Sequence, residues 1–273
     1  MQTFLPYPEF DRSAAVLDSP RLGKQRVETL QILRALTFPS YGWSNHPATL
    51  MWRGYVPALT SYGLAMVDAW TGRGAADSTR VQIAEFAPQA LTTPQSELAL
   101  PSWLGRGELH TSHQSNLIRK DPDFYGPRFP GVPGDLEYVW PGTDPGVVDR
   151  VVLGSPLVIL RPLDDRQLED WLGTGGVTLG EQSPTGRIGP KWRAQLELFA
   201  GLPDGTPFAA LQRAGGRLFL GEFAGAVTAF ADERQSGLRR PASFEGELQR
   251  SVFPYPALLQ DPQSIFVTTG PAT

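Results

Sequence analysis

Cysteine is absent from the 273-residue sequence, and its absence excludes several kinds of site. Without thiols the protein has no disulfides, no thiolate zinc sites and no iron–sulfur clusters, and histidine and carboxylate side chains remain as the strong metal ligands. A chain without cysteine fits a reducing compartment, and we expect a cytoplasmic location.

Long apolar runs and an excess of positive charge are also missing. The sequence has no run of about 18 apolar residues, so we expect no membrane span, and the N-terminal MQTFLPYPEF lacks the features of a signal peptide. The net charge is −4, so a nucleic acid would have to bind a local basic surface. The 41% hydrophobic content is normal for a globular protein with a substantial core.

Lysine is scarce. Lys24, Lys120 and Lys191 are the lysines, and the rest of the 24 basic residues are arginines. Few side-chain amines are therefore available as nucleophiles. An α-amine is better suited to imine chemistry, because its ordinary pKa is about 7.8 and that of lysine is about 10.4. Either amine needs a carboxylate nearby to move protons.

The most informative stretch is RLGKQRVETLQILRAL, residues 21–36, which predicts an amphipathic helix. Asp18 or Ser19 is expected to cap this helix, and Pro20 suits its first turn. Its polar side chains are either solvated ion pairs or a functional surface. Arg26 falls inside the apolar stripe, where a guanidinium needs a carboxylate, a phosphate or a wet cleft. The polar face carries Arg21, Lys24, Gln25, Glu28 and Gln31, and the apolar face carries Leu22, Thr29, Leu33 and Leu36, with Leu30 beside it.

The remaining segments predict two domains that meet in WPGTDPG, after Thr143. Residues 1–143 are expected to form a mainly α N-terminal domain, and residues 144–273 a mixed α+β C-terminal domain. No motif in the second domain carries chemistry, so its partner is left open. Further helices are expected at residues 11–17, 47–54, 57–70, 113–120 (capped by Thr111 or Ser112), 164–172 and 190–202, strands at 151–160 and 217–230, a turn at 215–216, and mostly loop at 87–107.

All the histidines, His46, His110 and His113, lie in the first half. A histidine-metal enzyme is the least favoured alternative, because the HxxH spacing lacks the HExxH arrangement, and we predict no metal site. The segment SHQSN carries amides and hydroxyls suited to phosphates and base edges, or to capping a helix. The sequence has no phosphate-loop pattern, no dinucleotide fingerprint and no GxSxG, so no cofactor is expected.

Three segments, in this order, resemble the pyrimidine-dimer DNA glycosylase/AP lyase (phage endonuclease V-like) family. They are RLGKQRVE, then NHPATLMW leading into a helix that ends AWTGRG, and finally HTSHQSNLIRKDPDFYGPRF. The resemblance covers about residues 1–140. MQTFLP and HQSNLIRKDP also look like an uncharacterised actinobacterial-type branch of this family.

The resemblance implies a compact endonuclease V-like helical domain that binds DNA with its N-terminus at the DNA-binding face. An α-amine would attack C1′ of the damaged nucleotide, and Glu28 would assist imine formation and β-elimination. Arg21 and Arg26 would hold phosphates. The other residues expected at the DNA are His46, His113, Gln114, Asn116, Arg119, Lys120, Phe124, Tyr125 and Arg128.

The sequence departs from the family at the nucleophile. The family removes methionine to expose a small residue, whereas Gln2 is too large for the usual trimming. We therefore expect Met1 to supply the catalytic amine, anchored by the apolar run at residues 4–6, with Lys24 as a substitute. The leading prediction is a DNA glycosylase with possible AP lyase activity. The alternative is a non-catalytic nucleic-acid-binding protein on the same scaffold.

Overall fold

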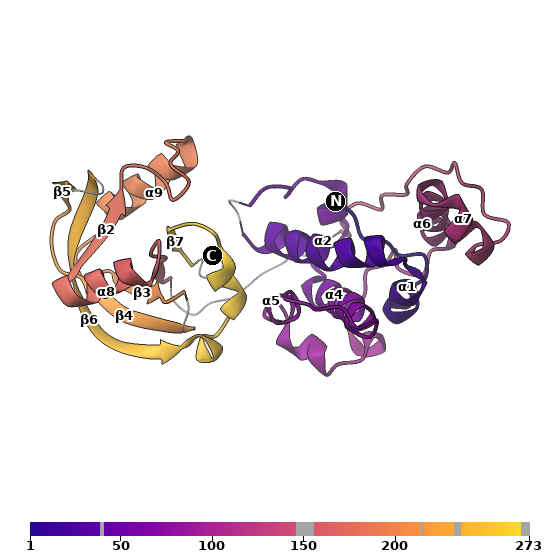
Figure 1. The fold of residues 1–273 in the computed structure, drawn as a ribbon, viewed down its shortest axis with the longest axis horizontal. Coiled ribbons are helices and arrows are strands. Elements are labelled where there is room, and N and C mark those ends of the chain that lie inside the picture. Colours follow the sequence, from indigo (N-terminus) through magenta and orange to yellow (C-terminus); the bar gives the residue numbers. More distant parts are fainter. Residues whose placement is uncertain (39–40, 146–155, 214–215, 232–235, 269–273) are drawn as a thin grey trace. The chain divides into compact units, whose positions relative to one another are not determined.

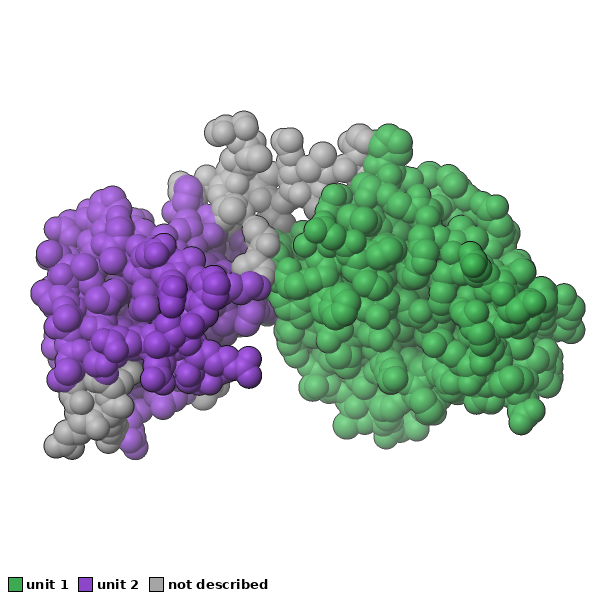
Figure 2. All heavy atoms as spheres, turned by 90° about the horizontal axis from the view of Figure 1, so that it is seen from above, with its two compact units in different colours: residues 1–150 green, residues 151–273 purple. Residues whose placement is uncertain are grey.

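The structure is a computed structural model that describes residues 1–38, 41–145, 156–213, 216–231 and 236–268. The chain divides into two compact units, residues 1–150 and 151–273 (Figures 1 and 2). The boundary predicted after Thr143 lies close to this division. Asp144 remains attached to the first unit, because its Oδ2 accepts a hydrogen bond of 2.7 Å from the Tyr55 hydroxyl. Among the described helices, none is long and apolar enough to cross a membrane.

The described residues of the first unit form helices and connecting loops, which confirms a mainly α N-terminal part. Residues 95–106 link the helical core to the last long helix of the unit. The helices are α1 (Phe10–Val16), α2 (Ser19–Thr37), α3 (Pro47–Leu50), α4 (Val56–Thr71), α5 (Arg80–Ala84), α6 (Gly107–Lys120) and α7 (Pro122–Tyr125), with short 3-10 helices η1 (Pro88–Leu91), η2 (Gln95–Glu97) and η3 (Gly126–Arg128).

Helix α2 forms the centre of the first unit and confirms the predicted amphipathic helix. Asp18 caps it as predicted, since the Asp18 Oδ1 accepts a hydrogen bond of 2.8 Å from the Arg21 backbone N–H. Its buried apolar side chains pack against α4. The two helices approach closely where Gly63 of α4 faces Thr29, and a Cβ at Gly63 would lie 2.7 Å from the Thr29 methyl group.

Two predicted helix boundaries in the first unit were wrong. Helix α6 begins at Gly107 rather than near residue 113, and Ser112 is a buried interior residue whose hydroxyl donates to the Leu109 carbonyl. The helix that begins at Pro47 ends at Leu50 instead of continuing to about residue 54. The stretch 87–107 is mostly loop as expected, with the short helices η1 and η2 within it.

The second unit is a curled mixed sheet with helices, which confirms the predicted mixture of helix and strand (Figure 1). Figure 1 places the long strand β6 along the outer curve of this sheet. The elements are β1 (Val158–Leu160), α8 (Asp165–Thr174), β2 (Gly176–Gly180), α9 (Pro190–Gly201), β3 (Pro207–Leu211), β4 (Arg217–Phe223), β5 (Thr228–Ala231), β6 (Ser236–Gln249), η4 (Arg250–Val252), η5 (Pro256–Gln260) and β7 (Ile265–Val267).

The strands of the second unit follow the order β2-β6-β4-β3-β1-β7, and β5 also pairs with β6. Strands β1 and β3 are parallel, and the other pairs are antiparallel. Both faces of the sheet are covered: Val158 and Leu160 pack into the cluster that contains Trp171 and Phe199, while Ile159 packs with Leu259 on the other face.

Two strand predictions need correction. The run 217–230 is divided between β4 and β5, and each part pairs with β6. Strand β1 occupies only the end of the run 151–160, whose first five residues lie outside the described residues. Gly215 of the predicted turn also lies outside them, and Gly216 has a φ of +63°.

A Gly63→Ala substitution tests the contact between α2 and α4. The added methyl group has no space beside Thr29, and we expect the free energy of unfolding to fall by roughly 1–3 kcal/mol. Gly107→Ala is the matched control, because a Cβ at Gly107 meets nothing within 4 Å. Denaturant unfolding of both variants measures the effect. Equal free energies of unfolding for the two variants would show that α2 and α4 can move apart without a cost in stability.

Candidate active site

The start of the chain lies along α2 and is held there by one buried glutamine. Gln25 is fully buried, and its Oε1 accepts hydrogen bonds from the Phe4 backbone N–H (2.9 Å) and the Tyr62 hydroxyl (2.6 Å). Its Nε2 donates to the Gln2 carbonyl (3.2 Å) and to Glu28 Oε2 (3.1 Å). Both acceptor positions and both N–H groups of the amide are therefore used.

The backbone partners determine which way this amide points. The Phe4 N–H can only donate and the Gln2 carbonyl can only accept, so Oε1 of Gln25 faces Phe4 and Nε2 faces Gln2. The second N–H of Nε2 is then directed at Glu28. Glu28 Oε2 also accepts a hydrogen bond of 3.3 Å from the Gln2 backbone N–H. The carboxylate is thus held against the second residue of the chain.

Two histidines of α6 hold the next part of the N-terminal segment. The Leu5 N–H donates to Nδ1 of His113 (3.1 Å), so the proton of this imidazole is on Nε2, and the ring lies edge-on to Tyr138 at 5.3 Å. The Gly105 N–H donates to Nε2 of His110 (3.0 Å), so Nδ1 of His110 carries the proton and donates to the Leu5 carbonyl (2.8 Å). Both polar groups of the Leu5 backbone are therefore bonded to neutral imidazoles.

Burial keeps these two rings uncharged. Desolvation, with a smaller contribution from His110, lowers the pKa of His113 from 6.5 to about 3. Desolvation also lowers the pKa of His110, and it outweighs the opposing hydrogen bond to Leu5 and the charge of Glu9. Neutral rings suit hydrogen bonds in which one nitrogen must accept.

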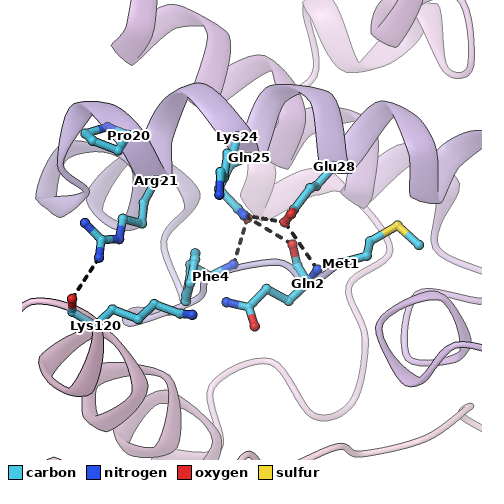
Figure 3. Close-up of a pocket in the computed structure, with 9 residues that line it drawn as sticks. All are labelled: Met1, Gln2, Phe4, Pro20, Arg21, Lys24, Gln25, Glu28 and Lys120. Carbon is cyan, nitrogen blue, oxygen red and sulfur yellow. Dashed lines mark hydrogen bonds between the residues drawn. The ribbon is translucent and has the colours of Figure 1, made fainter.

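A pocket of about 480 Å³ opens where the N-terminal segment meets α2 and the end of α6 (Figure 3). This volume is within the usual range for ligand sites. Three cationic side chains and one carboxylate contribute to the lining, so the pocket suits an anionic group beside a proton acceptor. The lining residues are Met1, Gln2, Phe4, Pro20, Arg21, Lys24, Gln25, Glu28 and Lys120.

Arg21 and Lys120 join α2 to the end of α6 at the edge of this pocket. The Arg21 guanidinium forms an ion pair with Asp18 at 2.5 Å, lies 3.7 Å from Asp121, and donates to the Lys120 carbonyl at 3.0 Å. The Lys120 ammonium lies 5.9 Å from the centre of the Phe4 ring. Arg21 therefore holds a fixed position, whereas the exposed Lys24 and Lys120 can adjust to a ligand.

Arg26, predicted to hold a phosphate, is not among the residues that line the pocket. Its guanidinium forms an ion pair with Asp77 and lies over the Trp70 ring, 4.4 Å from the ring centre. The Asp77 side chain is 4% exposed. Of the partners that the sequence allowed for Arg26, the structure contains the carboxylate.

The residues predicted for DNA binding between positions 113 and 128 divide into buried and accessible ones. His113, Asn116 and Tyr125 are fully buried and bond within the protein, so their direct contact with DNA stays a prediction that burial disfavours. Asn116 donates to the Ser112 carbonyl at 2.8 Å, and the Tyr125 hydroxyl accepts from the Asp18 N–H at 3.0 Å.

The accessible members of this set lie near the surface. Gln114 is half-buried and donates to the Pro6 carbonyl at 2.8 Å. Arg119 is exposed and bonds to the Asn116 side-chain oxygen. The Arg128 guanidinium lies 3.6 Å from the centre of the Phe124 ring. Their binding to DNA stays a prediction, and the described pocket includes Lys120 alone from this group.

Sequence reasoning missed three residues of this region. Gln25 was placed on the polar face, but a buried polar position cannot be recognised without the segment that covers it. Trp43 was not singled out, and Trp140 was assigned only to the domain boundary; their side chains are 59% and 37% exposed. An exposed indole is uncommon, but the sequence alone does not show which tryptophans are exposed.

The histidines do not form a metal site in the described structure. His110 and His113 each use a ring nitrogen to bind Leu5. Within the described ranges, no group of three or more His, Cys, Asp or Glu side chains is arranged to hold a metal ion.

Comparison with known protein families gave a match to the first part of the chain. The family model described as pyrimidine dimer DNA glycosylase matches residues 1–82, a range that includes the N-terminal segment, α2 and α4. The match confirms the resemblance seen in the N-terminal half and suggests a function of the DNA glycosylase type, with DNA as substrate. The comparisons with curated proteins and with solved structures gave no match.

Removing the Arg26 side-chain charge tests whether this residue is structural. Arg26→Met leaves the buried Asp77 carboxylate without its cation, and we expect the free energy of unfolding to fall by roughly 3 kcal/mol. The salt dependence of DNA binding should stay as in the wild type, because no phosphate contact is lost. A double variant with Asp77→Asn should recover part of the stability. A reduced salt slope with unchanged stability would instead place Arg26 at the DNA.

Acid should weaken the folded state through the two buried histidines. Below a pH of about 6.5 an unfolded histidine binds a proton, whereas folded His113 binds one only near pH 3. The stabilisation is complete above pH 6.5, and it is lost as the pH falls toward 3, at up to about 1.4 kcal/mol per pH unit for each such group. Urea unfolding from pH 7 to pH 4 measures this slope.

His113→Asn is the control for that measurement. The amide oxygen can still accept from the Leu5 N–H, but the titrating group is gone. We expect a lower stability at pH 7, because asparagine is smaller, and a shallower loss of stability in acid. A slope identical to that of the wild type would mean that His113 is charged in the folded protein.

Proposed function

We propose that the first unit is a DNA glycosylase with AP lyase activity whose nucleophile is the α-amine of Met1. The proposal rests on the family match over residues 1–82 and on one observation: Glu28 Oε2 is bonded to the Gln2 N–H at 3.3 Å, inside a pocket lined by cationic side chains. The beginning of the chain and a carboxylate therefore share one site. An amine beside a carboxylate is the pairing that imine chemistry requires.

In this reaction the neutral amine of Met1 attacks C1′ of the damaged nucleotide. The bond from C1′ to the base breaks, and the base leaves with a proton. The C1′–O4′ bond then breaks as the sugar ring opens, the remaining proton of the nitrogen passes to O4′, and an imine is left between Met1 and C1′. Removal of a proton from C2′ then expels the 3′-phosphate by β-elimination and breaks the strand.

Glu28 has the role of moving these protons. Its Oε2 is held by two N–H donors, from Gln2 and Gln25, so the carboxylate keeps one orientation at the start of the chain. A fixed acceptor avoids reorganisation during the reaction. It takes a proton from the amine and, at the elimination step, from C2′.

The cationic side chains of the pocket have the role of binding the DNA backbone. Arg21 is positioned by Asp18, while Lys24 and Lys120 are exposed and free to move toward phosphates. This local surface overcomes the unfavourable net charge of −4. Lys24 is also the substitute nucleophile, although an ordinary lysine carries far less neutral amine than an α-amine at pH 7.

A non-catalytic nucleic-acid-binding protein is the second candidate. The observation that favours it is that the nitrogen bonded to Glu28 is the Gln2 backbone amide, which is not a nucleophile, rather than the Met1 amine. The pocket would then bind DNA through its cations without reacting. Covalent trapping separates the two functions.

Glu28→Gln tests the proposed function. The substitution removes the proton acceptor and keeps the size of the side chain, so we expect strand cleavage at an abasic site to fall by roughly 100-fold or more, with folding and DNA binding retained. Borohydride reduction during the reaction should link the wild-type protein to abasic DNA. Cleavage by Glu28→Gln at the wild-type rate would remove Glu28 from the mechanism.

Peptide mapping of the trapped protein identifies the amine. Trypsin cuts after Arg12, so a Met1 adduct should appear in the peptide of residues 1–12. Lys24→Arg is the matched control, since it keeps the charge and removes the amine, and it should trap as well as the wild type. A label on Lys24 overturns the Met1 assignment, and competent binding without any label favours the non-catalytic protein.

A further inference from the structure

Two exposed tryptophans and a histidine form a cluster in the first unit. The ring centres of Trp43 and His46 lie 5.5 Å apart, those of His46 and Trp140 lie 6.2 Å apart, and both contacts are edge-on. Trp43 is 59% exposed and Trp140 is 37% exposed. The ring centres of Trp140 and Tyr138 lie 5.3 Å apart, and Tyr138 in turn contacts the ring of His113, which bonds the Leu5 backbone.

Trp43 holds its exposed position through an unfavourable backbone conformation. Its φ is +74°, and among the described residues it is the single non-glycine residue with a positive φ. The turn is closed by a hydrogen bond of 3.0 Å from the His46 N–H to the Trp43 carbonyl. A bulky residue in this region of φ is strained, and such strain is typical of functional positions. Glycine would fit the backbone better, so the indole is retained at a cost in stability.

His46 contributes a hydrogen-bond donor, and its partner shows which ring nitrogen carries the proton. The Ala48 N–H donates to its Nδ1 at 3.1 Å, so the proton of the neutral ring is on Nε2. Burial lowers the pKa of His46, and the positive charge of the α-amine lowers it further, against the charge of Glu28. The imidazole is therefore neutral. The row of rings that starts at His46 ends at His113, which bonds Leu5, and the preceding residue Phe4 lines the pocket.

We propose that Trp43, His46 and Trp140 form a base-binding platform, which takes one unpaired nucleobase beside the pocket. Planar indoles stack on any base, and the Nε2–H of His46 can donate to an acceptor on the base edge. The cationic side chains of the pocket supply the separate contact that a nucleotide needs for its phosphate. The inference rests on the proposed function in taking DNA as the ligand.

The proposal names an unpaired base rather than a base in a duplex. A paired base exposes only its edges, whereas a flipped base exposes both faces for stacking. An apolar partner protein would cover the indoles equally well, but it gives no reason for the neutral donor between them or for the cations nearby. DNA that contains an unpaired base should therefore bind more tightly than DNA in which that base is missing.

The experiment compares two duplexes with a single-residue bulge, one with a thymine nucleotide at the bulge and one with a three-carbon spacer that lacks both the base and the sugar ring. Fluorescence anisotropy with the full chain gives the dissociation constants. We expect the wild type to bind the thymine bulge at least about fivefold more tightly, as base–aromatic stacking predicts. Trp140→Ala and His46→Phe should each reduce this preference. Equal binding of both duplexes by the wild type would overturn the platform.

Trp43→Gly gives the sharpest test. It removes the indole and relieves the positive φ, so we expect a melting temperature no lower than that of the wild type together with loss of the base preference. The slope of binding against salt should not change, because no charge is lost. A retained preference would remove Trp43 from the platform, and a loss of preference that is accompanied by unfolding would show that the Trp43 ring is structural.

Two controls complete the design. Val81 of α5 is 71% exposed, and Val81→Ala should leave both affinities unchanged. Lys120→Ala should weaken binding of both duplexes equally and flatten the salt slope. The preference should persist in Glu28→Gln, which separates the two proposals: a protein that prefers the unpaired base but forms no borohydride adduct retains the platform and loses the lyase assignment.

Discussion

The hydrogen bonds of one buried amide, that of Gln25, determine where the chain begins in space. Its four partners belong to the N-terminal segment, to α4 and to Glu28. Loss of the amide would leave the Phe4 N–H buried without a partner, which costs about 1–3 kcal/mol, while the Tyr62 hydroxyl would keep its hydrogen bond of 3.0 Å to the Phe4 carbonyl. The candidate active site therefore depends on a residue that contacts no substrate in the proposed reaction.

His110 and His113 fix the position of Leu5 in the same way, because they bond its backbone C=O and N–H. Backbone polar groups that are removed from water need partners, and an extended segment cannot supply its own as a helix does. In this protein, side chains from α2 and α6 supply them, through Gln25, His110 and His113. A displaced segment would leave the Phe4 N–H and the Leu5 backbone groups without these partners, so the network favours one arrangement of the N-terminal segment over slightly displaced ones.

Local signals were sufficient to predict the long helices. Asp18, Pro20 and the 3.6-residue periodicity mark α2 within a single stretch of sequence, and Pro57 does the same for α4. The start of α6 was missed because Arg106, its N-cap residue, makes no side-chain capping bond, and the serine and threonine inside the helix gave a misleading capping signal. The division of 217–230 between two strands depends on the partner strand β6, which no local pattern shows.

The site was predicted in part, and the missing part is non-local. Glu28 and Lys24 follow from the helix and the family resemblance, and both line the pocket. Gln25 is buried because a segment more than 20 positions away lies over it. His113 and Tyr125 were expected at the DNA from the SHQSN segment and the family resemblance, whereas the N-terminal segment and the cap of α2 use them as internal partners. Residue type indicates the chemistry a side chain can perform, whereas burial decides whether a ligand reaches it.

Because the Gln2 N–H is bonded to Glu28, the number of residues ahead of position 2 determines which nitrogen near this carboxylate is an amine. An affinity tag fused before Met1 would turn its α-amine into a peptide amide and would have to leave through a pocket of about 480 Å³, so purification tags belong at the other end of the chain. Enzymatic removal of Met1 would have the opposite effect, since the nitrogen already bonded to Glu28 would itself become a primary amine. Keeping or removing Met1 thus moves the α-amine by one residue, which is about 3.8 Å along the backbone.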